Sequence, residues 1–570
     1  MRWVEPRTLP AVLLVLLVAL LLRLHGLDAE SLFMDELRQV SYYSHGLGEI
    51  VELAASQQQP PLDYWIGHLV FQLDRSDFAA RLPASLFGAA SAGLLVLLAA
   101  RHLGTGSATA LGLLYALMPF PMYYAQDARP YAIAIFFFML LLLVLRWALV
   151  ASTRVSTRLA LVCLVTFLFL LTRTLAPLVV VMVLCGLLLL WLMLPVPGLR
   201  KVPNVEAPIS RGRLLAVLVA MGIGVLLELP FLLRILELGG RYASNPGRVD
   251  LAVLSQGLER FTLEPFWGAL QAQAEPLGWA LAGLVAAAPI ALWRQPRLRR
   301  DPFAWGLLLL LPLTACLHSF VFHAKTDLPL RPPYAIYLLP LALVLAGMTL
   351  QGLLGPLRTG ARRMVSLALI AVVGLAVRPT TLAMKDYRSK TDWRGLAELI
   401  RSQSAGDRLL LFDALVSDGA WEPTFYGLPR YLHDPVNGIS IRDVPMLAER
   451  LADLELEPVL ILFEPRDYRL TPWSRYPVHP YATHQGRFNR AALLEQSGLD
   501  VQLLTGFVIL RLREPPGRLV PAMRALLAQT LALLPPDDTA EDQRRALREL
   551  DKLSTGSVAA EAGVAKDAAP

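Results

Sequence analysis

Long apolar stretches recur through the first two thirds of the chain, separated by short polar segments. A helix needs about 20 mainly apolar residues to cross the hydrocarbon core of a bilayer. Each stretch is interpreted as a span or the middle of one, which predicts about eleven membrane-spanning helices. They are expected at residues 8–24, 82–100, 107–125, 130–149, 159–172, 177–195, 214–237, 277–293, 303–321, 334–354 and 364–381.

Basic residues between the predicted spans indicate the orientation of the chain. Short loops rich in Arg and Lys stay in the cytoplasm, and this set of spans places the basic loops on one side. Those loops carry Arg2, Arg7, Arg154, Arg158, Arg200, Lys201, Arg211, Arg213, Arg294, Arg297, Arg299, Arg300, Arg358, Arg362 and Arg363. We therefore predict a multi-pass protein of a bacterial inner or sole membrane, with a cytoplasmic N-terminus and an extracytoplasmic C-terminal domain.

Composition agrees with this assignment and excludes several functions. The 570 residues are 55% hydrophobic and only 17% charged, and the mean hydropathy is +0.49. The net charge of +7 is explained by basic loops facing anionic lipid, so nucleic acid is not expected as a partner. The three cysteines fall within or beside spans and imply no disulfide framework or zinc site. No Walker motif, His-Glu-x-x-His or Gly-x-Ser-x-Gly is present, which argues against ATP-driven transport and common hydrolases.

The first outer loop, residues 25–81, is rich in groups that can do chemistry. We expect short surface helices at Asp35–Gly46 and Leu62–Leu73. Helical spacing places Asp35, Gln39 and Tyr42 on one face. A purely structural alternative stays open, in which Asp35 and Glu36 only favour the start of the helix electrostatically.

A second polar cluster, Tyr123–Tyr131, turns between the third and fourth spans. Arg129 and Asp127 lie there at the mouth of the bundle. An ionisable residue at membrane depth is costly and suggests a function. The structural alternative is an internal pair between Asp127 and Arg129 that stabilises the turn.

Beyond the last span the chain becomes polar. Predicted strands at Leu409–Asp413, Pro458–Glu464 and Phe507–Arg511 alternate with predicted helices at Trp393–Gln403, Val444–Leu454 and Arg490–Gly498. The expected organisation is a membrane module over 1–384, a small α/β domain with a partly parallel sheet over 385–515, and amphipathic helices with a disordered tail over 516–570. We expect the α/β domain to recognise the acceptor or to cover the site.

These motifs together resemble a known family. Asp-Glu in the first loop precedes Gln-Pro-Pro-Leu-x-Tyr, then Arg-Leu-Pro-x-Ser-Leu, and finally Gln-Asp-Ala-Arg-Pro-Tyr-Ala opening the fourth span. In this order they resemble the GT-C glycosyltransferases, in particular bacterial relatives of the protein O-mannosyltransferases and of the lipid A aminoarabinose transferases. The motif resemblance covers roughly residues 25–140.

The resemblance implies transfer of a hexosyl or pentosyl group from a polyprenyl-phosphate carrier to a hydroxyl or amine of a glycan, lipid or protein at the outer membrane face, usually with inversion. It makes Asp35 the catalytic acidic residue and Arg129 the cation near the lipid phosphate. Relatives often have Arg-Tyr before the late Leu-Leu-Pro, whereas this chain has Ile336-Tyr337, so Arg331 or Lys325 is the substitute. The full set of expected substrate-binding residues is Glu36, Gln59, Pro60, Tyr64, Arg81, Tyr124, Asp127, Arg129, Tyr131, Lys325 and Arg331.

The chemistry explains these residue types. One carboxylate suffices as base because the polyprenyl phosphate is already a good leaving group. A guanidinium can bind two phosphate oxygens as charge develops on them. No obligatory cofactor or metal is expected, although a divalent cation could bridge carboxylate and phosphate. The alternatives are a lipid-linked sugar or polysaccharide flippase and a scaffold for glycan assembly. A flippase should carry polar groups through both halves of the membrane, whereas the polar clusters of this sequence lie in the predicted outer loops.

Overall fold

The computed structural model describes most of the helical region and the regular elements of the C-terminal region. The described residues are 8–150, 155–193, 210–239, 255, 271–299, 301–326, 332–354, 392–403, 408–412, 430–431, 438–452, 454–463, 498–504, 507–515, 518–531 and 538–554. The chain forms two compact units. The first comprises Met1–Asp28 and Gln39–Tyr387, and the second comprises Ala29–Arg38 and Arg388–Pro570. The finer domain limits predicted from the sequence stay predictions.

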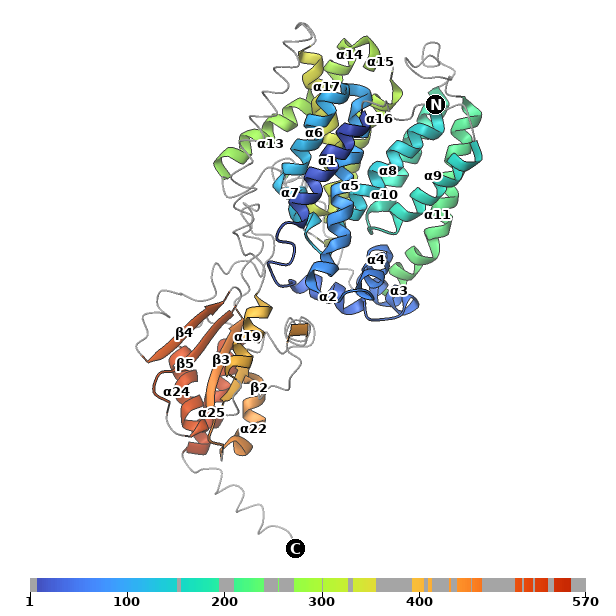
Figure 1. Cartoon of the computed structure of the whole chain (residues 1–570). Helices are drawn as coiled ribbons and strands as arrows, with labels where there is room; N and C mark the ends of the chain where they lie inside the picture. The colour runs from blue at the N-terminus through green and yellow to red at the C-terminus, as the bar shows by residue number, and fades with distance from the viewer. Residues whose placement is uncertain are drawn as a thin grey trace. The chain divides into compact units, whose positions relative to one another are not determined.

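The first unit is a bundle of helices that follow the predicted spans (Figure 1). Its main helices are α1 (Thr8–Leu24), α5 (Asp77–Leu103), α6 (Thr105–Leu117), α7 (Pro119–Ala125), α8 (Tyr131–Val150), α9 (Val155–Leu170), α10 (Ala176–Met193), α11 (Arg211–Gly239), α13 (Gln271–Ala286), α14 (Ala288–Arg294), α15 (Pro296–Arg299), α16 (Pro302–Thr326), η3 (Pro332–Leu338) and α17 (Leu339–Leu353). The predicted span at 364–381 lies outside the described residues.

Some predicted spans are divided into two helices. The span at 107–125 breaks at Met118, which is extended, with Pro119 starting the next helix. Proline has no backbone N–H to donate and is well suited to a first helical position. The late span begins as a 3₁₀ segment, η3, before Pro340 at the start of α17. The apolar pattern therefore located the segments but did not reveal these breaks.

Five helices among the described residues are long and apolar enough to cross a membrane by length and composition. They are Asp77–Leu103, Tyr131–Leu149, Arg211–Leu238, Phe303–His323 and Tyr334–Leu353. The predicted polytopic α-helical membrane protein with a small C-terminal sheet domain is thereby confirmed. The number of eleven spans stays a prediction.

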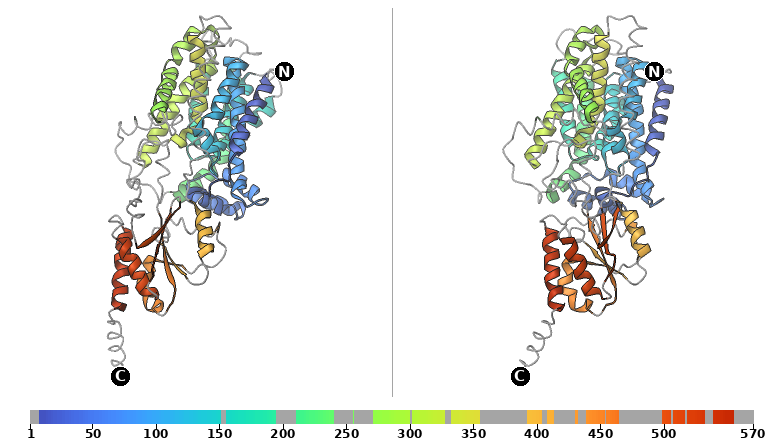
Figure 2. Two further views of the ribbon diagram at one scale, coloured as in Figure 1. Left: turned by 60° about the vertical axis from the view of Figure 1, so that its left-hand side comes forward. Right: turned by 90° about the vertical axis from the view of Figure 1, so that its left-hand side faces the viewer.

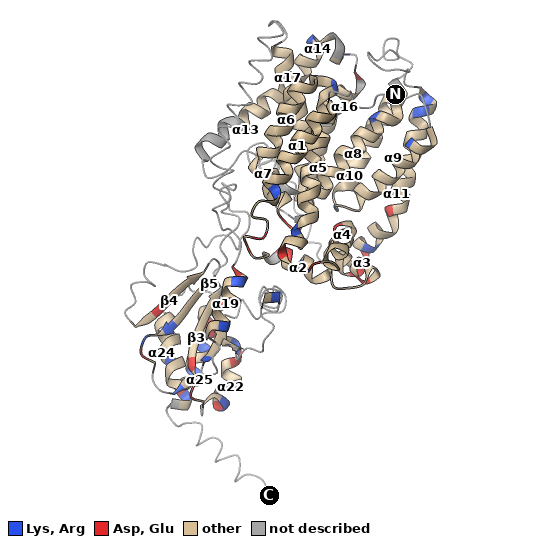
Figure 3. Cartoon of the chain, in the orientation of Figure 1, with Lys and Arg blue, Asp and Glu red and all other residues tan. Residues whose placement is uncertain are grey.

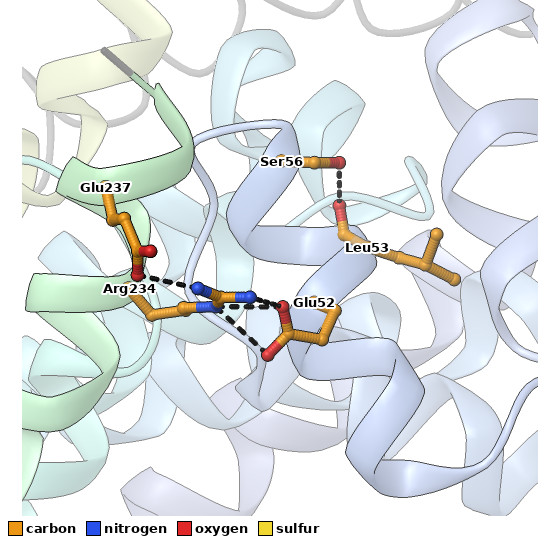
Figure 4. A network of polar contacts seen from close by, with 5 residues as sticks. All are labelled: Glu52, Leu53, Ser56, Arg234 and Glu237. Carbon is orange, nitrogen blue, oxygen red and sulfur yellow. Dashed lines mark hydrogen bonds and ion pairs between the residues drawn. The ribbon is translucent and has the colours of Figure 1, made fainter.

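Close approach of backbones supports packing within the bundle. A Cβ atom on Gly224 of α11 would lie 2.7 Å from the Cys163 carbonyl oxygen of α9, so glycine is needed for this crossing. The C-terminal end of α11 also contacts a helix of the first loop, α3 (Leu47–Ser56). Arg234 donates to both carboxylate oxygens of Glu52 and, at 2.6 Å, to Glu237 (Figure 4). This network is exposed, so its contribution to stability is small, at most about 1 kcal/mol per pair.

The second unit contains a five-stranded sheet in the order β2-β1-β3-β5-β4. The strands are β1 (Arg408–Phe412), β2 (Gly438–Ser440), β3 (Glu457–Phe463), β4 (Leu499–Leu504) and β5 (Phe507–Leu512). β1 pairs in parallel with β2 and β3, whereas β5 pairs antiparallel with both β3 and β4. This arrangement confirms the predicted partly parallel sheet and three of its strands; β2 and β4 were not predicted.

Helices cover both faces of this sheet, with α24 (Leu519–Leu531) and α25 (Asp538–Ser554) on one face and α19 (Trp393–Gln403) on the other (Figure 2). Successive side chains of β5 point to opposite faces of the sheet, so this strand contributes to the packing on both faces. Val508 and Leu510 are buried in the core with α22 (Val444–Leu451), α24 and α25, whereas the Phe507 ring meets the Trp393 ring at 4.9 Å. The predicted helix at Arg490–Gly498 lies outside the described residues except for Gly498.

Candidate functional site

The first loop forms three short helices, of which two were predicted. α2 (Met34–Tyr42) and α4 (Leu62–Phe71) match the expected surface helices, while α3 was missed. α3 starts after Gly46, which is extended, and buries Ile50 and Ala54 on one face by their i, i+4 spacing. Within the bundle, α3 and α4 lie at one end, and α14 and α15 lie at the other (Figure 1).

Gln39 on α2 connects three polar side chains at this end of the bundle. Its Nε2 donates to the Tyr43 hydroxyl at 3.0 Å and also to an Asp63 carboxylate oxygen on α4. Its Oε1 accepts a hydrogen bond from Arg129 at 3.4 Å. Gln39, Asp63 and Tyr43 are all buried. The predicted Arg129 therefore reaches across the bundle to the first loop.

Close packing between α2 and α4 brings Gln39 to Asp63. The ring of Tyr43 lies directly over Gly67, where a Cβ atom would be 2.1 Å from the ring carbon Cζ. In the next residue, His68 Nδ1 bonds to the Tyr43 carbonyl oxygen at 2.7 Å. Glycine at position 67 thus allows the Tyr43 ring to pack directly against the backbone of α4. His68 forms a hydrogen bond within the first loop.

Asp63 is a buried carboxyl group with a perturbed pKa. Burial raises its pKa to about 6, against the opposing effects of the hydrogen bond from Gln39 and the charges of Arg129 and Arg173. Burial, with a further contribution from Asp63, raises the pKa of Tyr43 well above its ordinary value. A buried carboxyl with a pKa raised this far, and with two guanidinium groups nearby, is typical of a functional site.

Arg173 is a member of this cluster that the sequence reasoning missed. It lies between α9 and α10 and is only 3% exposed. Its guanidinium lies over the Tyr131 ring at 4.6 Å and over the Tyr334 ring at 5.0 Å. The available signal was a lone arginine between two apolar stretches, on the same predicted side of the membrane as Arg129.

The Gln-Pro-Pro turn of the first loop is attached to the segment that carries Arg173. Gln58 has a left-handed φ of 56°, and its carbonyl oxygen accepts a hydrogen bond from Thr174. Leu62 N–H donates to the Leu171 carbonyl oxygen at 3.2 Å. Gln59 N–H donates to Ala54 at 2.9 Å, and Pro60 is buried. The strained backbone at Gln58 therefore lies where the loop meets the α9–α10 connection.

The aromatic residues predicted for the site pack against other tyrosines. Tyr64 stacks on Tyr42 with 5.9 Å between ring centroids, and Tyr124 lies 4.6 Å from Tyr131.

Two other predicted residues, Arg81 and Asp127, form hydrogen bonds that involve backbone carbonyl oxygens. Arg81 donates to the Leu27 carbonyl oxygen at 3.0 Å and is buried. The Arg129 N–H donates to the Asp127 carbonyl oxygen at 2.8 Å, which closes the turn before α8. Arg81 therefore connects the start of α5 to the chain segment that follows α1.

Asp35 and Glu36 belong to the second compact unit. Glu36 is buried and accepts a hydrogen bond from the Phe33 N–H at 2.9 Å, the contact that a Glu at the third position makes with the start of its own helix. In the same unit the Leu32 N–H donates to the Tyr431 hydroxyl at 3.0 Å, and the Arg394 N–H donates to Ser31 at 3.1 Å. The Asp35 side chain is partly exposed.

The late-span candidates are only partly described. Arg331 and the side chain of Lys325 lie outside the described residues. Tyr337, from the Tyr-Leu-Leu-Pro segment, is buried and bonds through its hydroxyl to His318 Nε2. Among the described residues, no three His, Cys, Asp or Glu side chains gather to hold a metal ion. In the described part of the bundle, Lys, Arg, Asp and Glu residues lie mainly toward its two ends (Figure 3).

Comparison with known proteins gives one family match. Residues 58–202, about a quarter of the chain, match the family model described as dolichyl-phosphate-mannose-protein mannosyltransferase. No curated protein matches the chain. This segment contains Asp63, Arg129 and Arg173.

Two solved structures illustrate the overall similarity. ArnT from Cupriavidus metallidurans bound to undecaprenyl phosphate is 15% identical, with a TM-score of 0.48 over 88% of this chain and 97% of that one. The oligosaccharyltransferase AglB from Archaeoglobus fulgidus, in complex with an inhibitory peptide and a dolichol-phosphate, is 12% identical, with a TM-score of 0.45 over 94% and 77%. It is the match of residues 58–202 to the protein mannosyltransferase family that confirms the resemblance to GT-C glycosyltransferases predicted from the loop motifs.

Proposed function

We propose that the protein transfers a sugar from a polyprenyl-phosphate carrier to a hydroxyl or amine acceptor at the outer membrane face, with inversion. The observation that carries this proposal is the gathering of Asp63, Arg129 and Arg173 at one end of the bundle, within the segment that matches the mannosyltransferase family. The solved relatives with undecaprenyl phosphate or dolichol-phosphate bound have the carrier chemistry proposed here.

Arg129 and Arg173 are proposed to meet the phosphate of the carrier. Negative charge develops on that phosphate as the bond to the sugar breaks, and fixed cations in a poorly hydrated site stabilise it. Tyr131 and Tyr334 hold the Arg173 guanidinium, while Gln39 accepts a hydrogen bond from Arg129. Both cations are therefore oriented before the carrier binds, which lowers the cost of reorganisation during transfer.

Asp63 is proposed as a positioning residue for these cations. Its carboxylate receives the Gln39 hydrogen bond, and the charges of Arg129 and Arg173 favour its ionised form. In return, the ionised carboxylate offsets part of the charge of two arginines that face the same region. Loss of this carboxylate should change how the phosphate is bound more than it changes the fold.

The base is assigned to Asp35 by the resemblance. An inverting transfer needs one carboxylate to take the proton of the acceptor as the sugar is attacked. Asp35 precedes Gln39 by four residues in the chain. The hydrogen bond from Phe33 gives its neighbour Glu36 a role in starting α2.

The test is turnover of the purified full-length protein with synthetic polyprenyl-phosphate mannose and polyprenyl-phosphate aminoarabinose, measured as release of polyprenyl phosphate. Asp35→Asn should lower turnover by about 10² to 10⁴ while carrier binding is kept. Near-normal turnover in this variant would remove Asp35 as the base.

A pair of variants tests the proposed role of Arg129 and Arg173. Arg129→Lys and Arg173→Lys keep the charge but lose the planar fork, so turnover should fall with little change in thermal stability. Arg75→Lys is the matched control, because Arg75 is exposed in the same loop region and lies over the Phe71 ring at 5.6 Å, away from the proposed phosphate site. Loss of stability without loss of turnover in Arg129→Lys would contradict a phosphate role.

The flippase alternative is separated by the same protein in vesicles. A transferase releases free polyprenyl phosphate and forms a glycosylated acceptor, whereas a flippase moves the intact carrier across the bilayer. Movement of intact carrier without release of polyprenyl phosphate would overturn the proposed reaction.

A further inference from the structure

A cavity of about 410 Å³ lies in the half of the bundle away from α3 and α4. It is formed by the last turns of α5 and α8, the second half of α10 and the first half of α16. Leucines dominate the lining, and the strongly polar groups are His102 and Arg146. The volume is within the usual range of about 300 to 1,000 Å³ for ligand sites.

The cavity is distinct from the candidate functional site. Tyr131, beside Arg173, begins α8, whereas Arg146 lies near the other end of the same helix. The rise of an α-helix, about 1.5 Å per residue, separates these two positions by about 22 Å along the axis. A carrier phosphate held by Arg173 is therefore too far away to be the group that Arg146 meets.

Three residues form a polar cluster at one end of the cavity. Arg146 lies 3.2 Å from His102 Nε2 and 3.7 Å from an Asp301 carboxylate oxygen. His102 Nδ1 is 3.5 Å from the same oxygen. The Arg146 guanidinium lies over the Phe303 ring at 4.9 Å.

The cluster retains an unused hydrogen-bond donor. Arg146 Nε is buried and has no hydrogen-bond partner among the residues that the structure describes. The guanidinium of Arg146 thus has an unused N–H group beside a single carboxylate, Asp301, so the polar end of the cavity can accept an anion.

The cavity opens sideways between α10 and α16. Leu189, Leu309 and Leu313 of its lining are 47%, 50% and 54% exposed, respectively. Leu145, Leu307 and Leu310 of the same lining are buried. The exposed leucines belong to segments that the apolar pattern places in the bilayer, so the opening faces lipid.

We propose that this cavity binds an anionic glycerophospholipid, with one acyl chain among the leucines and the headgroup phosphate at Arg146. The sequence places this end of the bundle on the cytoplasmic side, where anionic lipids gather and basic pockets between helices bind their headgroups. A guanidinium forms strong, charge-assisted hydrogen bonds with phosphate oxygens. The site is separate from the proposed transfer reaction and does not depend on it.

The test measures lipid retention by the delipidated, full-length protein with native mass spectrometry, using dioleoyl phosphatidylglycerol and dioleoyl phosphatidylcholine as probes. The wild type should retain one phosphatidylglycerol at least about tenfold more strongly than phosphatidylcholine. Arg146→Gln should lose this preference. Arg294→Gln is the matched control, since it removes an exposed arginine at the same end of the bundle outside the cavity lining, and it should behave as the wild type.

A second variant tests the cavity itself while keeping Arg146. Gly186 lines the cavity and has open space where a side chain would begin, so Gly186→Trp should fill it and abolish retention of both lipids. Wild-type retention of phosphatidylglycerol by Gly186→Trp would overturn the proposal, as would equal retention of the two lipids by the wild type. Displacement of phosphatidylglycerol by an equimolar polyprenyl phosphate would show instead that the cavity takes the carrier.

Discussion

The buried carboxyl group of Asp63 should make the protein less stable as the pH rises, and Asp63→Asn should remove this dependence. The pKa of this group is raised to about 6 in the folded protein, from an ordinary value of 3.8. The protonated form is therefore favoured by folding. Its stabilising contribution is fully present below pH 3.8 and is lost as the pH rises through 6.

The magnitude follows from the two pKa values. A difference of about two pKa units, at about 1.4 kcal/mol for each unit, amounts to a cost of about 3 kcal/mol for ionised Asp63 at neutral pH. The Asn side chain has nearly the same shape and can still accept the hydrogen bond from Gln39 through its amide oxygen. Asp63→Asn should consequently be more stable than the wild type at pH 7.5.

Thermal unfolding of the two purified proteins from pH 4.5 to 7.5 measures this difference. The advantage of Asp63→Asn in Tm should grow with pH and level off above about pH 6.5. Turnover of the variant should nevertheless fall, because a group kept at a cost in stability is kept for function. A Tm difference that does not change with pH, or a variant that is less stable throughout, would refute the reasoning.

Three further predictions concern the loop helices and the topology. Gly67→Ala should displace the Tyr43 ring and lower stability by about 1 to 3 kcal/mol, measured by thermal unfolding beside Gly48→Ala, whose new Cβ would meet nothing within 4 Å; equal stability of the two variants would contradict the close packing. Glu36→Ala should cost about 1 kcal/mol through loss of the hydrogen bond from Phe33, and Glu36→Gln should recover most of it; a Gln variant as unstable as Ala would argue against the cap. Cysteine introduced at exposed Arg299 should be labelled from the cytoplasm and at exposed Ser402 from outside; cytoplasmic labelling of Ser402 would reverse the predicted sidedness.

Local regularities in the sequence were enough to predict much of the fold. Continuous apolar stretches of membrane-spanning length mark the positions of α1, α5, α8 and their neighbours, because hydrocarbon requires an apolar helix surface whatever the neighbours are. Short apolar runs likewise indicated the strands β1, β3 and β5. Short elements such as α3, β2 and β4 were missed, since a few residues carry too little periodic signal.

The sequence by itself also determined which residues could do chemistry in the first loop and at the turn before α8, and its motifs determined the family resemblance. Only the tertiary structure decided which of them meet. Gln39 contacts both Asp63 and Arg129, and Arg173 enters from a connection that carries no motif, because these neighbours come from different helices. The cluster of His102, Arg146 and Asp301 was likewise not predicted from the sequence, because its members lie far apart along the chain. Spacing along one chain specifies the face of a helix, whereas the pKa of a buried group depends on the other helices that exclude water from it and on the charges they bring near it.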